Sequence, residues 1–178
     1  MLNGQPSYRQ LFLSYGGRDK PFAWRLAEDL SGLSVSIWFD DWELEGGDPL
    51  HESIGAAIEK SEFFGPILSP DFLSSRWCRA ELDQALTREH RIGRKVVLPL
   101  LHRRVQVPPL LEGRLHLNFS RLYYVSLAEL CGVILGIEVK ALRSSMLKSR
   151  PRSLNDVKSL LVAQGWVAGD LGRFCRRS

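Results

Sequence analysis

Cysteine is scarce in this chain of 178 residues, with only Cys78, Cys131 and Cys175. An odd number of cysteines at such wide spacing excludes a disulfide framework and paired-cysteine metal sites, and it indicates a reducing compartment. Long apolar runs are also missing, since stretches such as 96–101 reach only about six residues, against the ~20 of a membrane helix. The opening residues, MLNGQPSYRQ, lack the basic and apolar regions of a signal peptide. We therefore expect a cytoplasmic protein without a membrane segment.

Common catalytic and metal-binding signatures are absent from the sequence as well. It contains no GxSxG elbow, no P-loop and no CxxC pair. The four histidines, His51, His90, His102 and His116, show no metal-ligand spacing, so we interpret them as core or surface residues. Cys78 falls on the apolar stripe of an expected helix, where packing explains it better than nucleophilic catalysis. No metal and no resident cofactor are expected.

Charge is distributed unevenly along the chain. A composition of 44% apolar and 25% charged residues is that of a globular protein, and the length corresponds to one domain with a remainder. Residues 1–138 carry 15 Lys and Arg against 18 Asp and Glu, whereas residues 139–178 carry 9 against 2. The body is therefore mildly acidic and the tail strongly basic. Such a tail can contact nucleic acid or an acidic partner, or it can be a solvated linker.

Segments of strand character alternate with segments of helical periodicity over the first 138 residues. Asp19 is the expected N-cap of the first helix, and a capping box of Ser126 and Glu129 is the expected start of the last. This alternation predicts an α/β fold with a five-stranded parallel sheet and helices on both faces. Ligands bind such sheets beyond the carboxyl ends of the strands, in the loops that follow them. The strands are predicted at 10–14, 35–39, 63–68, 95–101 and 115–119.

The pattern changes after residue 138. We interpret residues 139–152 as a linker and residues 153–178 as a helical C-terminal extension. Ser153 and Asp156 form a capping box that predicts a helix, and a single short helix must bury its apolar face on the body or on another molecule. Because of its basic charge, we expect this extension to act as a regulatory or coupling element that contacts the acidic loop of the body or a protein partner. It can also be the start of a small effector-associated module.

Three motifs follow one another along the body. They are LFLSY with Asp19, the stretch WFDDWELEGG, and ILSPDFLSSRWCRAEL. In this order they resemble the TIR (Toll/interleukin-1 receptor) domain family, whose S-x-W-C-x-x-E-L helix is matched by residues 75–82 and whose BB loop is matched by residues 39–47. The resemblance covers residues 7–138 and implies a flavodoxin-like fold. It also implies one of two functions, since some TIR domains are non-catalytic adaptors and others cleave NAD⁺ at the nicotinamide–ribose bond.

Enzymatic members of the family carry a glutamate at the position of Glu81, which we therefore expect to be catalytic. Nicotinamide in NAD⁺ is cationic and leaves as a neutral molecule, so one carboxylate can suffice to bind the ribose hydroxyls and stabilise the oxocarbenium-like charge. Glu81 is expected at the rim of the covered face of its helix, one turn after Cys78, and Trp77 is expected to form a wall of the pocket. The alternative interpretation of Glu81 is a solvated helix glutamate.

The loop at 15–19 is a candidate site for the diphosphate. Gly16 and Gly17 permit close backbone approach next to a helix N-terminus, and Arg18 supplies a charge-assisted contact. Tyr15, Gly16 and Arg18 are therefore expected to bind substrate. Enzymatic family members carry basic residues where Gly16 and Gly17 stand, and a plain turn is an equal alternative.

The second loop is acidic, with six Asp and Glu between residues 40 and 52, and no Lys or Arg between residues 26 and 59. These acids repel a diphosphate unless they face ribose or a basic partner. Glu45 matches a second family glutamate near the pocket, and Trp42 can stack on a base or serve as an interface residue. The substrate-binding residues expected in this loop are Asp41, Trp42, Leu44 and Glu45.

Together these residues favour a TIR-domain NAD⁺ glycohydrolase that releases nicotinamide and either ADP-ribose or a cyclic ADP-ribose isomer. We expect an immune, anti-phage effector activated by homotypic TIR–TIR self-assembly, in which a basic surface of a neighbouring copy meets the acidic loop. The alternative is a non-catalytic adaptor that signals through TIR–TIR contacts, and the presence of Glu81 with Trp77 favours the enzyme. Nucleic-acid binding by the tail is a third interpretation, compatible with either.

Overall fold

The fold is known from a computed structural model that describes residues 9–38 and 50–166. Five parallel strands form one sheet in the order β2-β1-β3-β4-β5, with β1 between β2 and β3. This is the order of flavodoxin-like, doubly wound sheets, which confirms the predicted fold class. The strands are β1 (Arg9–Ser14), β2 (Ile37–Trp38), β3 (Ser61–Leu68), β4 (Leu100–Leu101) and β5 (Leu117–Asn118).

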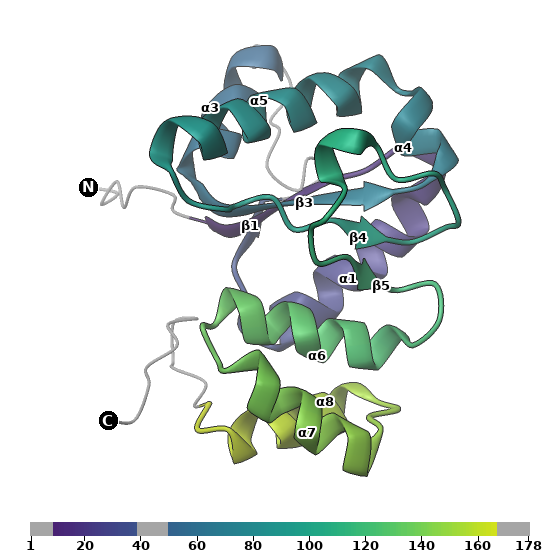
Figure 1. Ribbon diagram of the computed structural model, residues 1–178, viewed down its shortest axis with the longest axis vertical. Helices are drawn as coiled ribbons and strands as arrows, with labels where there is room; N and C mark the ends of the chain where they lie inside the picture. The colour runs from purple at the N-terminus through teal and green to yellow at the C-terminus, as the bar shows by residue number, and fades with distance from the viewer. Residues whose placement is uncertain (1–8, 39–49, 167–178) are drawn as a thin grey trace, which may run out of the picture.

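Helices cover both faces of this sheet (Figure 1). Helices α3 and α5 lie on one face, whereas α1 and α6 lie on the other, with α7 and α8 forming a further layer beyond α6 (Figure 1). Each face has its own apolar core. The helices are α1 (Lys20–Gly32), α3 (Leu50–Lys60), α4 (Pro70–Ser74), α5 (Arg76–Ile92), α6 (Tyr123–Ile134), α7 (Val139–Ser149) and α8 (Leu154–Ala163), with short 3-10 turns at η1 (Gly17–Asp19) and η2 (Pro109–Leu111).

The central strands are apolar on both sides because helices cover both faces. In β1, Leu11 and Leu13 point into the core beneath α1 and α6, whereas Phe12 points into the core beneath α3 and α5. Phe12 stacks between two aromatic rings of the neighbouring strands, at 4.6 Å from Trp38 and 5.4 Å from Phe64 between ring centroids. These contacts fix the register of the three strands that carry the loops of interest.

The segment that follows β3 forms two consecutive helices, α4 and α5. Ser69 caps α4 by accepting a hydrogen bond from the amide of Phe72 at 3.0 Å. Ser75 has an extended backbone that interrupts the helix, and its hydroxyl accepts from the amide of Cys78 at 3.2 Å, which starts α5. Two serine caps in close succession therefore separate the helices.

The predicted capping box of Ser126 and Glu129 is wrong. Helix α6 begins at Tyr123, so Ser126 lies inside it, where its hydroxyl donates to the carbonyl of Asn118 at 2.8 Å. Glu129 instead accepts a hydrogen bond from Arg143 of α7, at 2.7 Å. Contacts with the end of β5 and with α7 replace the local cap.

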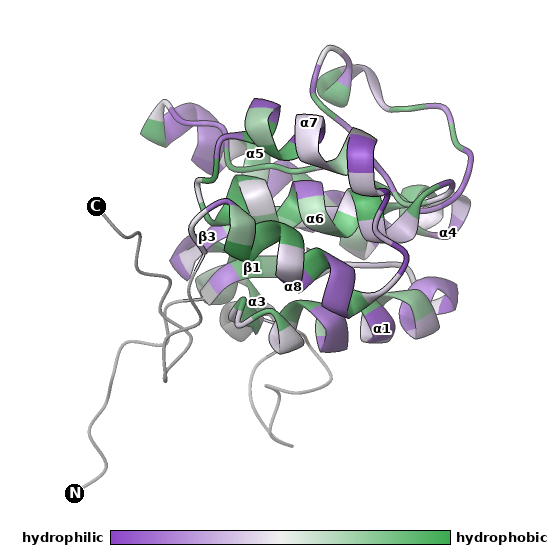
Figure 2. Cartoon of the chain, turned by 90° about the horizontal axis from the view of Figure 1, so that it is seen from below, coloured by the Kyte–Doolittle hydropathy of each residue, from purple (hydrophilic) through white to green (hydrophobic). Residues whose placement is uncertain are grey.

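The tail packs on the body, and most of the predicted linker is helical. Residues 139–149 form α7, and the capping box of Ser153 and Asp156 at the start of α8 is confirmed. Helices α6, α7 and α8 contact one another, and Figure 2 shows the hydrophobic residues along α6 and α8. The apolar face of the tail is therefore buried on α6, and residues 40–49 of the acidic segment lie outside the described residues. The buried hydrophobic residues of the tail core are Leu142, Met146, Val157, Leu160, Leu161 and Trp166.

Within the described ranges, none of the helices has both the length and the apolar character needed to cross a membrane.

Candidate active site

The candidate site lies at the carboxyl ends of β1 and β3, where the strand order changes direction. The chain leaves β1 into the loop that starts at Tyr15, and it leaves β3 at Ser69 into α4 and α5. In doubly wound sheets, ligands bind beyond the carboxyl ends of the strands at such a switch point. The N-terminal half of α5, with Trp77 and Glu81, packs at this end of β1.

Glu81 is buried at this point, and the end of β1 holds its carboxylate. Only 7% of Glu81 is exposed, and the hydroxyl of Ser14 donates a hydrogen bond of 2.5 Å to Glu81 Oε2. Ser14 is itself 2% exposed. Burying a carboxylate costs free energy unless hydrogen bonds compensate it, so this contact is part of what keeps Glu81 in place. Glu81 is therefore a buried residue and not a solvated helix glutamate.

Cys78 provides a second link between α5 and β1. Its thiol donates to the carbonyl of Tyr15 at a sulfur–oxygen distance of 3.3 Å. Burial, together with the charge of Glu81, raises the pKa of the Cys78 thiol to about 11, although hydrogen bonds with Ser75 and Ser14 act in the opposite direction. The thiol is thus protonated at neutral pH. It packs in the core beneath α3 and α5, as predicted, and is unsuited to nucleophilic catalysis.

Trp77 lies one turn before Glu81 on α5. Its side chain is half-buried and packs against the apolar core beneath α3 and α5. A wall of the pocket formed by Trp77 stays a prediction.

The first loop is held against α4. A Cβ added to Gly16 would lie 2.6 Å from Asp71 Oδ2 and 2.7 Å from the amide nitrogen of Phe72. The backbone amide of Arg18 donates to Asp71 Oδ2 at 2.8 Å, and its guanidinium Nε lies 3.9 Å from Asp71 Oδ1. Gly16 is therefore required for contact with α4, whereas nothing lies within 4 Å of a Cβ added to Gly17. The Arg18 side chain is 85% exposed and accessible to an anion.

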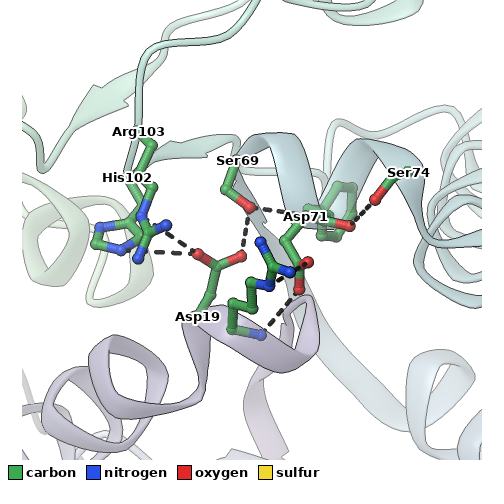
Figure 3. A network of polar contacts seen from close by, with 8 residues as sticks. Asp19, Ser69, Asp71, Ser74, His102 and Arg103 are labelled. Atoms are coloured by element: carbon green, nitrogen blue, oxygen red, sulfur yellow. Dashed lines mark hydrogen bonds and ion pairs between the residues drawn. The ribbon is translucent and has the colours of Figure 1, made fainter.

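Asp19 joins the loops that follow three strands (Figure 3). Its carboxylate is fully buried, and the hydroxyl of Ser69 donates to Oδ2. Asp19 Oδ1 lies 3.8 Å from His102 Nε2 and 3.8 Å from Arg103 Nε, both of which follow β4. Although Asp19 occupies the predicted N-cap position, its side chain makes no cap hydrogen bond. Its role is to tie the loops together at the switch point.

The environment of His102 opposes protonation. Its ring stacks on Phe22, with 3.9 Å between centroids. Burial lowers the pKa of His102 below its ordinary value, and Arg103 acts in the same direction, although Asp19 opposes them. A neutral imidazole beside Asp19 is therefore the favoured state at neutral pH.

The sequence did not identify Ser14 or Asp71 as contributors to this site. Ser14 is the last residue of β1, a position from which a side chain reaches the ligand edge of the sheet, and that position was the available signal. Asp71 follows the S-P pair that starts α4. Among the described residues no group of three potential metal ligands occurs. Four residues predicted to bind substrate lie outside the described ranges and stay predictions: Asp41, Trp42, Leu44 and Glu45.

Comparisons with known proteins identify the family. Residues 11–131 match the family model of the TIR domain. The 2' cyclic ADP-D-ribose synthase AbTIR of Acinetobacter baumannii is 37% identical over 100 residues, which are 56% of this chain and 36% of that protein. The NAD(+) hydrolase TcpC of Escherichia coli is 33% identical over 103 residues, which are 57% of this chain and 34% of that protein. The match thus spans about a third of the length of these curated relatives.

A solved structure has the same fold. The TIR domain of the Toll-related receptor TRR-2 from Hydra magnipapillata superimposes with a TM-score of 0.61 at 22% identity, covering 70% of this chain and 96% of that one. The sheet order, the position of the helices and the match over residues 11–131 agree. The chain belongs to the TIR domain family.

Proposed function

We propose that this TIR domain cleaves NAD⁺ at the bond between nicotinamide and ribose. The observation that carries the proposal is the buried carboxylate of Glu81, held by Ser14 at the ligand edge of the sheet. The names of the bacterial relatives, NAD(+) hydrolase and 2' cyclic ADP-D-ribose synthase, support the choice of substrate.

The proposed reaction needs no acid catalyst. When the bond between C1′ and the pyridinium nitrogen breaks, its electron pair moves to that nitrogen, and nicotinamide leaves as a neutral molecule. Positive charge then develops on the ribose ring as an oxocarbenium-like state. The carboxylate of Glu81 stabilises this charge and accepts hydrogen bonds from the ribose hydroxyls, and its burial strengthens both interactions. A carboxylate has about four acceptor positions, so it can accept several hydrogen bonds at once.

The same intermediate can give two products. Addition of water at C1′, with loss of a proton, gives ADP-ribose. Attack at C1′ by a nucleophile of the same ADP-ribose unit, with loss of its proton, gives a cyclic isomer. The described residues are compatible with both products.

We further propose that the protein acts as an immune effector that is activated by self-assembly. The composition supports this proposal, because the acidic segment 40–52 repels a diphosphate, whereas a basic surface on a neighbouring copy would neutralise it. Cleavage of a central cofactor inside an infected cell would then be restricted to the assembled state.

The test is nicotinamide release by the purified chain. The protein is incubated with NAD⁺ in dilute buffer and under crowding that promotes assembly, and the products are separated by liquid chromatography and mass spectrometry. We expect nicotinamide together with ADP-ribose or a cyclic isomer. Assembled protein that releases no nicotinamide would contradict the proposal and favour the non-catalytic adaptor.

A further inference from the structure

We infer that Ser14 is a positioning residue, which fixes the side chain of Glu81 in the orientation needed for cleavage. The inference rests on the proposed function, because it assigns a role in the same reaction. It is based on the direct hydrogen bond from the Ser14 hydroxyl to Glu81 Oε2, between two buried side chains.

The backbone of Ser14 is fixed by strand pairing. Ser14 is the last residue of β1 and lies opposite Pro66 of β3 in the parallel register. At 2% exposure its side chain has no room to move into solvent. A hydroxyl attached to this rigid position therefore gives Glu81 a fixed donor, as a well-ordered site requires.

The Ser14 hydroxyl acts on the reaction through Glu81, and it also lies beside the Cys78 thiol. A serine hydroxyl has a single proton to donate, and Ser14 donates it to Glu81 Oε2. A hydrogen bond of this kind favours the ionised carboxylate over the protonated one. Loss of the hydroxyl would therefore have two consequences, a less defined orientation of Glu81 and easier protonation of its carboxylate.

The hydrogen bond of Cys78 allows the loss of the Ser14 hydroxyl to change Glu81 without a general loosening of α5. Because Cys78 Sγ donates to the carbonyl of Tyr15, α5 keeps a second attachment to the end of β1 when the Ser14 hydroxyl is removed. Cys78 also belongs to the core beneath α3 and α5. Ser14→Ala is thus expected to disturb Glu81 without detaching α5.

The experiment compares Ser14→Ala and Ser14→Thr with a matched control, Ser61→Ala. Ser61 is also a buried serine of the sheet, 1% exposed, and its hydroxyl donates to the carbonyl of Ala57 at 2.8 Å. It lies at the other end of β3, where the strand begins. Ser61→Ala therefore removes a comparable hydrogen bond away from Glu81.

For each variant, kcat and KM for NAD⁺ are measured from acidic to alkaline pH. Ser14→Ala should lower kcat by about ten- to a hundredfold, with KM changed by less than about threefold. The acid limb of its pH profile should move toward higher pH, because the carboxylate protonates more easily. Ser14→Thr, which keeps the hydroxyl, should have most of the wild-type kcat and the wild-type acid limb. Ser61→Ala should have the wild-type kcat and the wild-type acid limb.

The inference is overturned if Ser14→Ala has the same kcat and the same acid limb of the pH profile as Ser61→Ala. The proposed function stands in that case. If the wild-type protein does not cleave NAD⁺, the proposed function fails. The effect of Ser14 on Glu81 is then tested by a measurement that does not depend on activity. The carboxyl carbon of Glu81, assigned by comparison with Glu81→Gln, is titrated by NMR in glutamate-labelled protein. A midpoint at higher pH in Ser14→Ala than in wild type supports the inference, and an unchanged midpoint overturns it.

Discussion

Gly16 packs against Asp71 more closely than a side chain would permit. A Cβ at Gly16 would lie 2.6 Å from Asp71 Oδ2 and 2.8 Å from the backbone carbon of Asp71. Together with the hydrogen bond from the Arg18 amide to Asp71, this contact attaches the loop after β1 to α4. The loop is therefore a rigid part of the candidate site.

Gly16→Ala should destabilise the protein by about 1–3 kcal/mol, because the added methyl group meets backbone atoms of α4 that have little freedom to move. Gly17→Ala is the matched control. Nothing lies within 4 Å of a Cβ at that position, so its effect should stay within about 0.5 kcal/mol. Urea unfolding followed by circular dichroism measures both. Equal midpoints for the two variants would show that the loop does not contact α4 as described.

Glu89 connects α5 through hydrogen bonds to residues 96–97, which precede β4. Its carboxylate accepts from the amides of Val96 and Val97 at 2.8 and 3.0 Å, and it pairs with Arg114 at 2.7 Å. Burial raises the pKa of Glu89, but these amides and the guanidinium together outweigh burial and hold the pKa below its ordinary value of 4.5. The ionised carboxylate therefore stabilises the folded state.

Glu89→Gln should lower the free energy of unfolding at pH 7 by about 1–3 kcal/mol. Because the folded-state pKa of Glu89 is lowered, its contribution is complete above the ordinary value of 4.5 and is lost as the pH falls through the folded-state value. The difference between wild type and variant should thus shrink below about pH 4.5. Glu112→Gln, at an exposed position, is the control. A difference that stays constant from pH 7 to pH 3 would contradict this role.

The tail is part of the folded domain, because its apolar residues complete the core around α6. Leu161 on α8 is fully buried, whereas its neighbour Val162 is 56% exposed. Leu161→Ala should cost about 2–4 kcal/mol of stability, and Val162→Ala less than about 0.5 kcal/mol. Thermal and urea unfolding measure both effects. A Leu161→Ala variant as stable as Val162→Ala would mean that α8 does not pack on the body.

Much of the fold could be predicted from the sequence, because hydrophobic periodicity reports burial. The alternation of strands and helices gave the five-stranded parallel sheet, and the Ser153–Asp156 capping box gave the start of α8. The burial of Cys78 also followed from the apolar stripe of its helix. These features depend on residues close to one another in the chain.

Features that depend on distant residues could not be predicted in this way. Ser126 stands where a helix cap was predicted, but its hydroxyl donates to the carbonyl of Asn118 instead. Helix α7 was predicted as a linker because most of its residues are polar or basic, although Leu142 and Met146 are buried. Asp19 stands at a predicted N-cap position, yet its carboxylate contacts Ser69 and His102, which follow two other strands. The hydrogen bond between Ser14 and Glu81 spans 67 positions, so no local pattern reveals it.

Activity should depend on protein concentration if the acidic loop is neutralised by a neighbouring copy. The specific rate of NAD⁺ cleavage should rise over a hundredfold range of concentration, in parallel with the assembled fraction from light scattering. High salt should reduce both quantities, because screening weakens attraction between exposed charges. A monomer with a constant specific rate over the whole range would contradict activation by assembly.

Nicotinamide release by Glu81→Gln is the most direct test of the proposed function. Glutamine keeps an oxygen that can accept the hydrogen bond of Ser14, whereas Glu81→Ala would leave the buried hydroxyl of Ser14 without this acceptor at a cost of about 1–3 kcal/mol. Glu28→Gln, at an exposed position of α1, serves as the control. We predict that Glu81→Gln folds and assembles like wild type, while its rate of nicotinamide release falls by at least about a hundredfold and that of Glu28→Gln is unchanged. Retention of more than about a tenth of the wild-type rate by correctly folded Glu81→Gln would contradict the assignment of Glu81 as the catalytic residue.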